Sequence, residues 1–276
     1  MYQINNKEET FEIPKLDKIT IKGSSRSAYR TGYLIQPYNI YLDAGHPSPV
    51  PPSMVLLSHG HHDHVASLYS ILINSEKTVP VLIPSCLETN IQEMLNAFYT
   101  MNNGKKSIYN KWTPVKTKSY TTIINSKNIS IDVFNLDHRV RTHGYGIKQI
   151  NKRLKEDYIG KSGRELAELK KTTDITFEIK IPMLLFISDT GKKILPNLPF
   201  SEYPLVIIEC TFFEEEHYEE AISRKHLHWN DLEPYIKANP ETKFILGHFS
   251  CRYNNEYLEE KEAQLKLIYS NIIFWI

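Results

Sequence analysis

Four histidines and one aspartate, all residue types that bind metal ions, stand close together early in this sequence, at His59, His61, His62, Asp63 and His64. A short apolar run of the kind expected for a buried strand ends just before them. Because alternate residues of an extended chain point to the same side, His59 and His61 can face one cavity while His62 points away. Asp63 and His64 are expected on the first turn of a following helix, which would aim them into the same cavity.

This set of side chains indicates a metal site at the end of a strand. Imidazole nitrogens together with carboxylate oxygens favour zinc, with manganese or iron as alternatives and magnesium or calcium disfavoured. Two pairs of ligands from one turn indicate two ions rather than one. The alternative is a histidine-rich surface loop that binds metal by accident, but such a loop is not expected to follow a buried strand with this spacing.

Later apolar runs of the sequence end in the same way, with a histidine or an acidic residue. The runs 129–136, 183–187, 205–208 and 244–246 are followed by His138, Asp189, Glu209 and His248. Strand and helix patterns alternate along the chain, which favours an α/β fold with these side chains at one sheet edge. Asp43 closes an earlier strand and is interpreted either as an orienting partner of a ligand histidine or as a turn residue.

The composition limits the classes of protein to which this chain can belong. With 276 residues it is long enough for one large domain or two small ones. Its formal net charge of +1 provides no overall basic field, so a site for a polyanion must be a local patch. The three widely spaced cysteines favour a reducing compartment. Because neither a membrane-spanning run nor a signal-peptide core is visible, we expect a soluble protein inside the cell.

Two basic stretches are candidates for phosphate contact. The window 148–171 is the most basic part of the chain, with Lys148, Lys152, Arg153, Lys155, Lys161, Arg164, Lys170 and Lys171. It lies between the candidate ligands His138 and Asp189, so we expect it to leave the sheet edge and return, projecting on the side where substrate binds. The polar stretch 23–30, with Arg26 and Arg30, has the same two interpretations as this window, a solvated segment or a phosphate contact.

The whole series of candidate ligands resembles that of the metallo-β-lactamase superfamily, which implies an α/β fold, an αββα sandwich with a dinuclear metal site. Three further strings resemble ribonuclease Z, the tRNA 3′-processing endonuclease: Glu209-Cys-Thr-Phe212, Lys225-His226 and His248-Phe-Ser-Cys-Arg-Tyr253. The resemblance extends from about residue 30 to 255. The Pro-x-Lys-x-Arg-Asn loop of that family is not found, and the window 148–171 is similar to the shorter, plant-like form of its arm.

The resemblance implies roles for individual residues. One zinc ion would be held by His59, His61, His138 and Asp189, and the other by Asp63, His64, Asp189 and His248, with Asp189 between them. Asp63 would orient the attacking water, and His226, oriented by Glu209, would protonate the leaving oxygen. Since His228 follows two residues later, sequence leaves open which of the two histidines acts. Substrate contacts are expected from Arg252, Lys152, Arg153 and Lys155.

We therefore expect a single metallo-β-lactamase-like domain over residues 1–276, with a short basic insertion at about 148–171. The expected activity is zinc-dependent removal of the 3′ trailer from precursor tRNA, leaving a 3′-hydroxyl, by a cytoplasmic or nuclear homodimer. The alternatives are a hydrolase of small phosphodiesters or esters and a non-catalytic RNA-binding paralogue. The presence of every expected ligand argues against the paralogue, while Glu209, His226 and the basic window favour the endonuclease.

Overall fold

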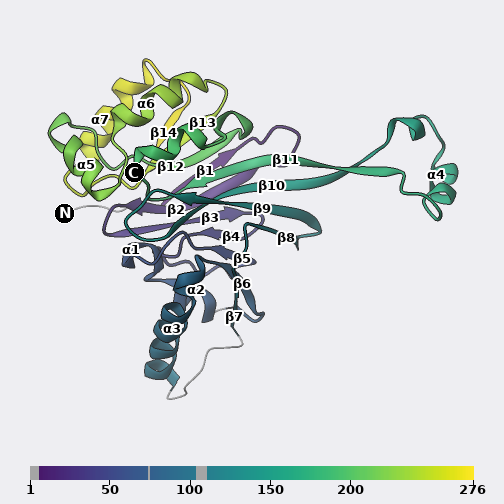
Figure 1. Ribbon diagram of the computed structural model, residues 1–276, viewed down its shortest axis with the longest axis horizontal. Coiled ribbons are helices and arrows are strands. Elements are labelled where there is room, and N and C mark those ends of the chain that lie inside the picture. Colours follow the sequence, from purple (N-terminus) through teal and green to yellow (C-terminus); the bar gives the residue numbers. More distant parts are fainter. Residues whose placement is uncertain (1–5, 74, 104–110) are drawn as a thin grey trace.

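The computed structural model describes residues 6–73, 75–103 and 111–276 of the chain. Two seven-stranded sheets pack face to face in this part of the chain, with helices on their outer faces (Figure 1). The predicted α/β fold, an αββα sandwich, is confirmed. Residues 1–5, on which part of the expected absence of a targeting sequence depends, lie outside the described residues.

The first sheet contains the strands of the amino-terminal half in sequence order. Its pairs are antiparallel from β1 to β4 and parallel from β4 to β7. The strands are β1 Lys7–Phe11, β2 Ile19–Arg26, β3 Arg30–Gln36, β4 Ile40–Leu42, β5 Met54–Leu56, β6 Val79–Leu82 and β7 Trp112–Val115. The helices of this half are α1 His62–Val65, α2 Leu68–Ile73 and α3 Glu88–Asn103.

The second sheet repeats this change from antiparallel to parallel pairing, with the parallel pairs between β11 and β14. Its strands are β8 Ser119–Ile124, β9 Lys127–Leu136, β10 Thr142–Leu154, β11 Thr176–Ile187, β12 Leu205–Glu209, β13 Lys243–Gly247 and β14 Ile272–Phe274. The helices of this half are α4 Gly163–Leu169, α5 Tyr218–Arg224, α6 Trp229–Ala238 and α7 Asn255–Lys266.

Three clusters of buried apolar side chains hold these layers together. Ile21, Tyr145 and Phe186 belong to the cluster between the two sheets. A second cluster joins the second sheet to its helices, and a third joins the first sheet to α2 and α3. Burying one large apolar side chain contributes about 1.5–3 kcal/mol, so the core fixes the positions of the strand ends that carry the polar residues.

The strands β10 and β11 extend far beyond the body of the molecule as a two-stranded arm (Figure 1). Their register shifts between Ile147 and Lys148, and beyond Ile150 β10 pairs only with β11 among the described residues. The tip of the arm contains α4, which begins with a capping box formed by Ser162 and Glu165. The basic window 148–171 therefore follows β10 outward and includes the tip.

The arm leaves the metal-site edge and returns to it, as the sequence predicted, but its tip lies far from that edge. β10 begins at the metal-site edge, where the amide of His143 donates a hydrogen bond to the carbonyl oxygen of Ser58 (2.9 Å), and β11 ends two residues before Asp189. The tip lies at the opposite ends of both strands, and 12 or 13 extended residues span roughly 40 Å. The window therefore lies far from the metal ligands of its own chain, and its contact with the body of a tRNA away from the cut stays a prediction.

The stretch 23–30 was interpreted as a solvated segment or as a phosphate contact. It forms the end of β2 and the turn into β3, and Arg26 is buried, with only 4% of its surface exposed. The guanidinium of Arg26 donates a hydrogen bond to the carbonyl oxygen of Tyr253, which joins the first sheet to the segment after β13. A solvated loop is the wrong interpretation for this arginine.

Within residues 6–73, 75–103 and 111–276, no helix is both long enough and apolar enough to cross a membrane.

Candidate metal centre and active site

The seven predicted ligands meet at one edge of the sandwich. His59, His61, His138 and Asp189 form one group, and Asp63, His64 and His248 form a second; within each group the candidate ligand atoms all lie within 4.8 Å of one another. The resemblance implied these two sets with Asp189 as a member of both. His62 is exposed and belongs to neither, as the alternation of side chains predicted.

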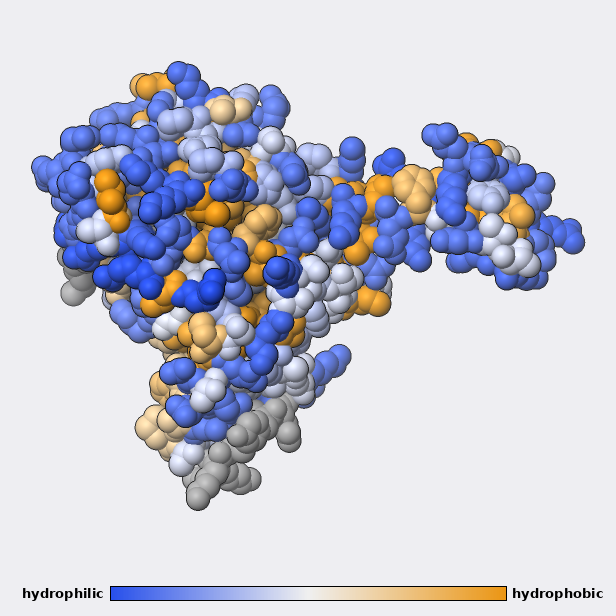
Figure 2. Space-filling model, in the orientation of Figure 1, coloured by the Kyte–Doolittle hydropathy of each residue, from blue (hydrophilic) through white to orange (hydrophobic). Residues whose placement is uncertain are grey.

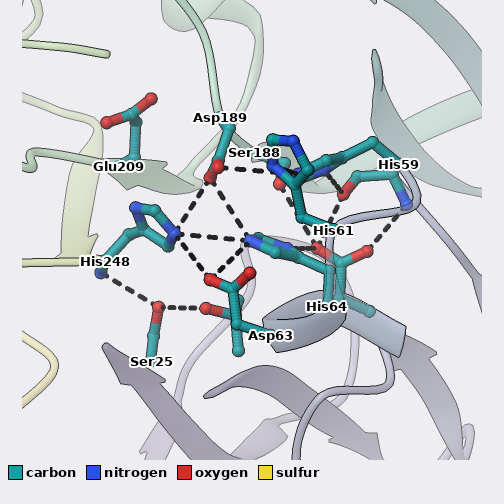
Figure 3. Close-up of polar contacts among 12 residues, drawn as sticks. Ser25, His59, His61, Asp63, His64, Ser188, Asp189, Glu209 and His248 are labelled. Carbon is teal, nitrogen blue, oxygen red and sulfur yellow. Dashed lines mark hydrogen bonds and ion pairs between the residues drawn. The ribbon is translucent and has the colours of Figure 1, made fainter. Parts of the chain in front are cut away.

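Asp189 lies between the two groups (Figure 3). Its Oδ2 is 3.6 Å from Nε2 of His59 and 3.9 Å from Nε2 of His138, whereas its Oδ1 is 3.2 Å from Nε2 of His248. One carboxylate oxygen therefore faces each group, which is the arrangement that a bridging ligand requires.

The chemistry of the donor atoms fits metal ions. Nε2 of His138 and Oδ1 of Asp189 are buried without a hydrogen-bond partner, and such atoms are rare unless they have a function. Burial lowers the pKa of His59 to about 2, so its imidazole stays neutral and keeps a lone pair for a metal. These donor atoms fit two divalent cations, and the identity of the ions as zinc is a proposal.

The pKa of His64 shows the opposite effect. Burial disfavours its charged form, yet the nearby carboxylates of Asp189 and Asp43 outweigh burial and raise this pKa well above the ordinary value. The pocket therefore has enough negative charge to attract a cation to this position, as expected of a site for a divalent metal.

The backbone brings the first ligands together through one glycine. A Cβ atom on Gly45 would lie 1.7 Å from the carbonyl oxygen of Asp63, so a larger residue would push β4 away from α1. The amide of Ala44 donates a hydrogen bond to the carbonyl oxygen of His64 (2.7 Å) across the same contact. The close approach of these two segments places Asp63 and His64 beside His59 and His61, which follow β5.

Glu209 and His226 form a pair next to the metal groups. Nδ1 of His226 lies 3.0 Å from Oε1 of Glu209, so Nε2 is the ring nitrogen left to face a substrate. Glu209 also accepts hydrogen bonds from the amides of Thr190 (2.6 Å) and Leu227 (3.1 Å). Burial opposes protonation of His226, but the charge and hydrogen bond of Glu209 raise its pKa to about 9. His226 is therefore held as a charged donor.

His228 has a different environment. It is fully buried and caps the amino terminus of α6, where its Nδ1 accepts a hydrogen bond from the amide of Asn230 (3.1 Å). Its Nε2 lies 3.1 Å from the carbonyl oxygen of Glu214. Both ring nitrogens are occupied within the fold, so the geometry favours His226 for a role in chemistry.

The predicted substrate-binding residues are not brought together. Arg252 and His226 line the same groove, whereas Lys152, Arg153 and Lys155 lie in the arm. Nζ of Lys155 donates a hydrogen bond to the carbonyl oxygen of Asp174 (2.6 Å), so it is partly engaged inside the arm. These four residues cannot contact the same part of a substrate.

Comparisons with known proteins agree with the sequence motifs, although no protein-family model matches the chain. The chain is similar to tRNase Z TRZ1 of Arabidopsis thaliana, with 22% identity over 262 residues, covering 91% of this chain and 92% of the relative. It is also similar to the chloroplastic tRNase Z TRZ2 of the same plant, with 25% identity over 265 residues, covering 92% and 73%. The predicted resemblance to ribonuclease Z is confirmed.

Solved structures decide the fold. The metallo-β-lactamase fold protein YhfI from Bacillus subtilis matches with a TM-score of 0.58 and 17% identity, covering 91% of this chain and 92% of that chain. Human tRNase Z, short form, matches with a TM-score of 0.56 and 13% identity, covering 91% of this chain and 93% of that chain. The chain has a metallo-β-lactamase fold.

Within this metallo-β-lactamase fold, Asp43 and two serines that the sequence did not single out position the candidate ligands. Nδ1 of His64 lies 2.7 Å from Oδ2 of Asp43, so the interpretation of Asp43 as an orienting residue is confirmed. Hydroxyls of Ser58 (2.8 Å) and Ser188 (3.2 Å) also donate to Oδ2 of Asp43. Each serine directly precedes a ligand in the sequence, which is a weak signal because serine is common before such residues.

A further missed residue holds the last ligand. The amide of His248 donates a hydrogen bond to the hydroxyl of Ser25 (2.9 Å), and His248 has a φ of 59° (Figure 3). This left-handed conformation is uncommon for a histidine and needs support from its surroundings. Ser25 lies in β2 of the other sheet, far away in sequence, so no local pattern could have revealed its contact with His248.

Proposed function

We propose that this chain is a zinc-dependent endoribonuclease that removes the 3′ trailer from precursor tRNA and leaves a 3′-hydroxyl on the tRNA. The observation that carries the proposal is the Glu209–His226 pair beside the metal groups, because it adds a held proton donor to a dinuclear site. The resemblance to ribonuclease Z supports tRNA as the substrate, and so does the similarity to two plant tRNase Z proteins.

The proposed ligands would hold two zinc ions, which would activate a water molecule and offset the negative charge on the scissile phosphate. Asp63 orients that water or takes its proton. Its carboxylate is ionised: burial opposes the charge, but hydrogen bonds with His248 and His64 hold its pKa well below the ordinary value. The amide of Ala28 donates a hydrogen bond to Oδ2 of Asp63 (3.0 Å) and fixes the carboxylate.

His226 donates the proton that the leaving oxygen needs. Protonating the leaving 3′ oxygen from Nε2 avoids forming a free alkoxide, and a positioned acid of this kind typically contributes about 10²–10⁴-fold. Glu209 orients the ring and stabilises its charged form. Arg252 remains a proposed contact to the RNA.

The arm and the assembly belong to the same proposal. We place Lys152, Arg153 and Lys155 on the body of the RNA, because their distance from the metal edge excludes contact with the cut in the same chain. A homodimer is proposed from the ribonuclease Z resemblance, and light scattering of the purified protein tests it. Residues 1–276 are proposed to form a single domain that acts in the cytoplasm or nucleus.

The decisive experiment compares two substrates for the zinc-loaded protein, a precursor tRNA with a trailer and bis(p-nitrophenyl) phosphate. The proposal expects cleavage of the RNA at one position, with a 3′-hydroxyl on the tRNA product and a much higher kcat/KM than for the small diester. Efficient hydrolysis of the small diester with no cleavage of the RNA would instead support a hydrolase of small phosphodiesters.

A further inference from the structure

His226 lines a groove of about 490 Å³. Thr211, Phe212 and His226 expose little surface and form its inner end, while the more exposed Glu220, Arg224 and Arg252 form its outer part. Its volume lies within the range of ligand-binding clefts in proteins. Glu220, Arg224 and Arg252 belong to none of the candidate metal groups, so these three charged side chains require an explanation of their own.

The three charged residues of the groove are arranged around Glu220. Nη1 and Nη2 of Arg252 donate to the two carboxylate oxygens of Glu220 at 2.6 and 2.9 Å. Nε of Arg224 lies 2.9 Å from Oε1 of the same carboxylate. One acidic residue therefore holds two arginines, and the three side chains keep a net positive charge.

The state of Arg252 determines what it can offer to a ligand. Both of its terminal nitrogens bond to Glu220, so this pair of donors is not free to bind a phosphate. The guanidinium lies over the ring of Phe212, with its carbon 5.7 Å from the ring centroid, and 45% of the side chain is exposed. What remains available is a flat, cationic surface of the kind on which nucleobases stack.

Arg224 offers a different contact. Only its Nε is engaged by Glu220, and 55% of the side chain is exposed. Among the described residues, no hydrogen bond or ion pair occupies its terminal nitrogens. Arg224 can therefore reach a phosphate oxygen while Arg252 supports a base.

We propose that this groove binds the nucleotide on the 5′ side of the cut, with its base stacked on Arg252 and its 5′ phosphate contacted by Arg224. The inference rests on the proposed function, since His226 protonates the 3′ oxygen of that nucleotide and stands at the inner end of the groove. The last nucleotide that remains on the RNA therefore enters the groove, while the trailer leaves on another side. Glu220 is the positioning residue that fixes both arginines.

The experiment measures binding of a product-like RNA, so that it does not depend on cleavage. The probe is a fluorescent hairpin RNA with one unpaired 3′ nucleotide and a 3′-hydroxyl, compared with the same hairpin carrying an abasic 3′ nucleotide. For the zinc-loaded protein, fluorescence anisotropy should give an affinity about tenfold or more higher for the probe with the base.

Substitutions identify the surface that recognises the base. Arg252→Lys keeps the charge but removes the flat guanidinium, so the ratio of the two affinities should fall to about one. Glu220→Gln weakens the ion pair that orients Arg252, so it should lower the ratio of the two affinities by a smaller amount. Lys237→Ala, an exposed change on α6, should leave the ratio as in the parent protein. Circular dichroism melting checks that each variant is folded.

The possible outcomes separate this inference from the function on which it rests. A parent protein that cleaves precursor tRNA but binds both hairpins equally would overturn the groove assignment alone, as would an unchanged ratio in Arg252→Lys. Failure to cleave any precursor RNA, with small-diester hydrolysis intact, would overturn the proposed function. A precursor with its first trailer nucleotide made abasic provides a last check, because sensitivity of Arg252→Lys to that base would place the trailer in the groove instead.

Discussion

The metal edge of the sandwich and the arm belong to the same sheet, yet they are built in opposite ways. At the metal edge six of the seven proposed ligands are buried, and carboxylates, hydroxyls or carbonyls of other elements contact several of them. In the arm, exposed side chains surround two strands that pair only with each other, and Figure 2 shows mostly hydrophilic residues there. The metal edge fixes the positions of its polar side chains, whereas the arm carries charged side chains far from the body of the molecule.

This difference predicts a division of effects. Substitutions at the metal edge should change metal content or turnover, because that edge positions reacting atoms. Substitutions in the arm should change the binding of a large substrate and leave the reacting atoms in place. The following variants test this division.

The largest effect is expected for Asp189→Ala. One carboxylate serves both metal groups, and no other described residue could take its place between His59 and His248. Both metals should be lost or misplaced, and activity should fall by several orders of magnitude. Elemental analysis gives the metal content, with Asp174→Ala in the arm as the matched control. Two zinc equivalents retained by Asp189→Ala would show that this residue does not bridge.

A smaller effect, still at the metal edge, separates the two neighbouring histidines. His226→Ala should lower kcat by about 10²–10⁴-fold with the metals retained, since it removes the proton donor and no proposed ligand. His228→Ala should lower the melting temperature, because it removes a buried helix cap, which is typically worth about 1 kcal/mol. Steady-state kinetics and thermal melts measure both; the reverse assignment of these two losses would transfer the acid role to His228.

The next effect in size is expected at Asp43, which contacts the proposed ligand His64. Asp43→Asn keeps the shape of the side chain but removes the charge that orients His64. Partners of this type typically contribute about 10–100-fold to metal affinity, and zinc affinity should fall by that factor in a chelator competition. Asp132→Asn, which changes a carboxylate paired with Lys148 at 3.0 Å, is the control. An equal loss in both variants would mean that Asp43 acts through general charge.

How much of this could be predicted from sequence depends on the range of each contact. That the candidate ligands meet was predictable, because they follow apolar strands in series and the ends of strands in one layer meet at one edge. The pairing of Glu209 with His226 came from the family resemblance, because residues 17 apart in sequence give no local signal of contact. The serine that supports His248 comes from the other sheet and was missed.

The arm shows a different limit. Its basic composition was visible in the sequence, and so was its position between His138 and Asp189. Its direction was not, because that depends on how far β10 and β11 remain paired after they leave the body. Charge alone identifies a candidate surface for a polyanion, but only the register of the two strands shows on which side of the molecule it lies.

The smallest effect on chemistry is expected from the arm itself. Replacing Lys152, Arg153 and Lys155 together by alanine should raise KM for precursor tRNA and leave kcat nearly constant, because contacts far from the cut contribute equally to substrate and transition-state binding. Each lost phosphate contact should also reduce the slope of log affinity against log salt concentration by nearly one. Lys155 should contribute least, since its ammonium group already bonds within the arm.

The control for this variant removes three positive charges elsewhere, at Lys237, Lys243 and Lys266 on the α6 and α7 side of the second sheet. Filter binding at several salt concentrations and steady-state kinetics on precursor tRNA and on bis(p-nitrophenyl) phosphate measure the result. If the arm variant lost activity on both substrates by the same factor, the arm would support the metal edge and not the RNA. If both triple variants flattened the salt slope equally, RNA binding would depend on overall charge, and the distinction between the two regions would fail.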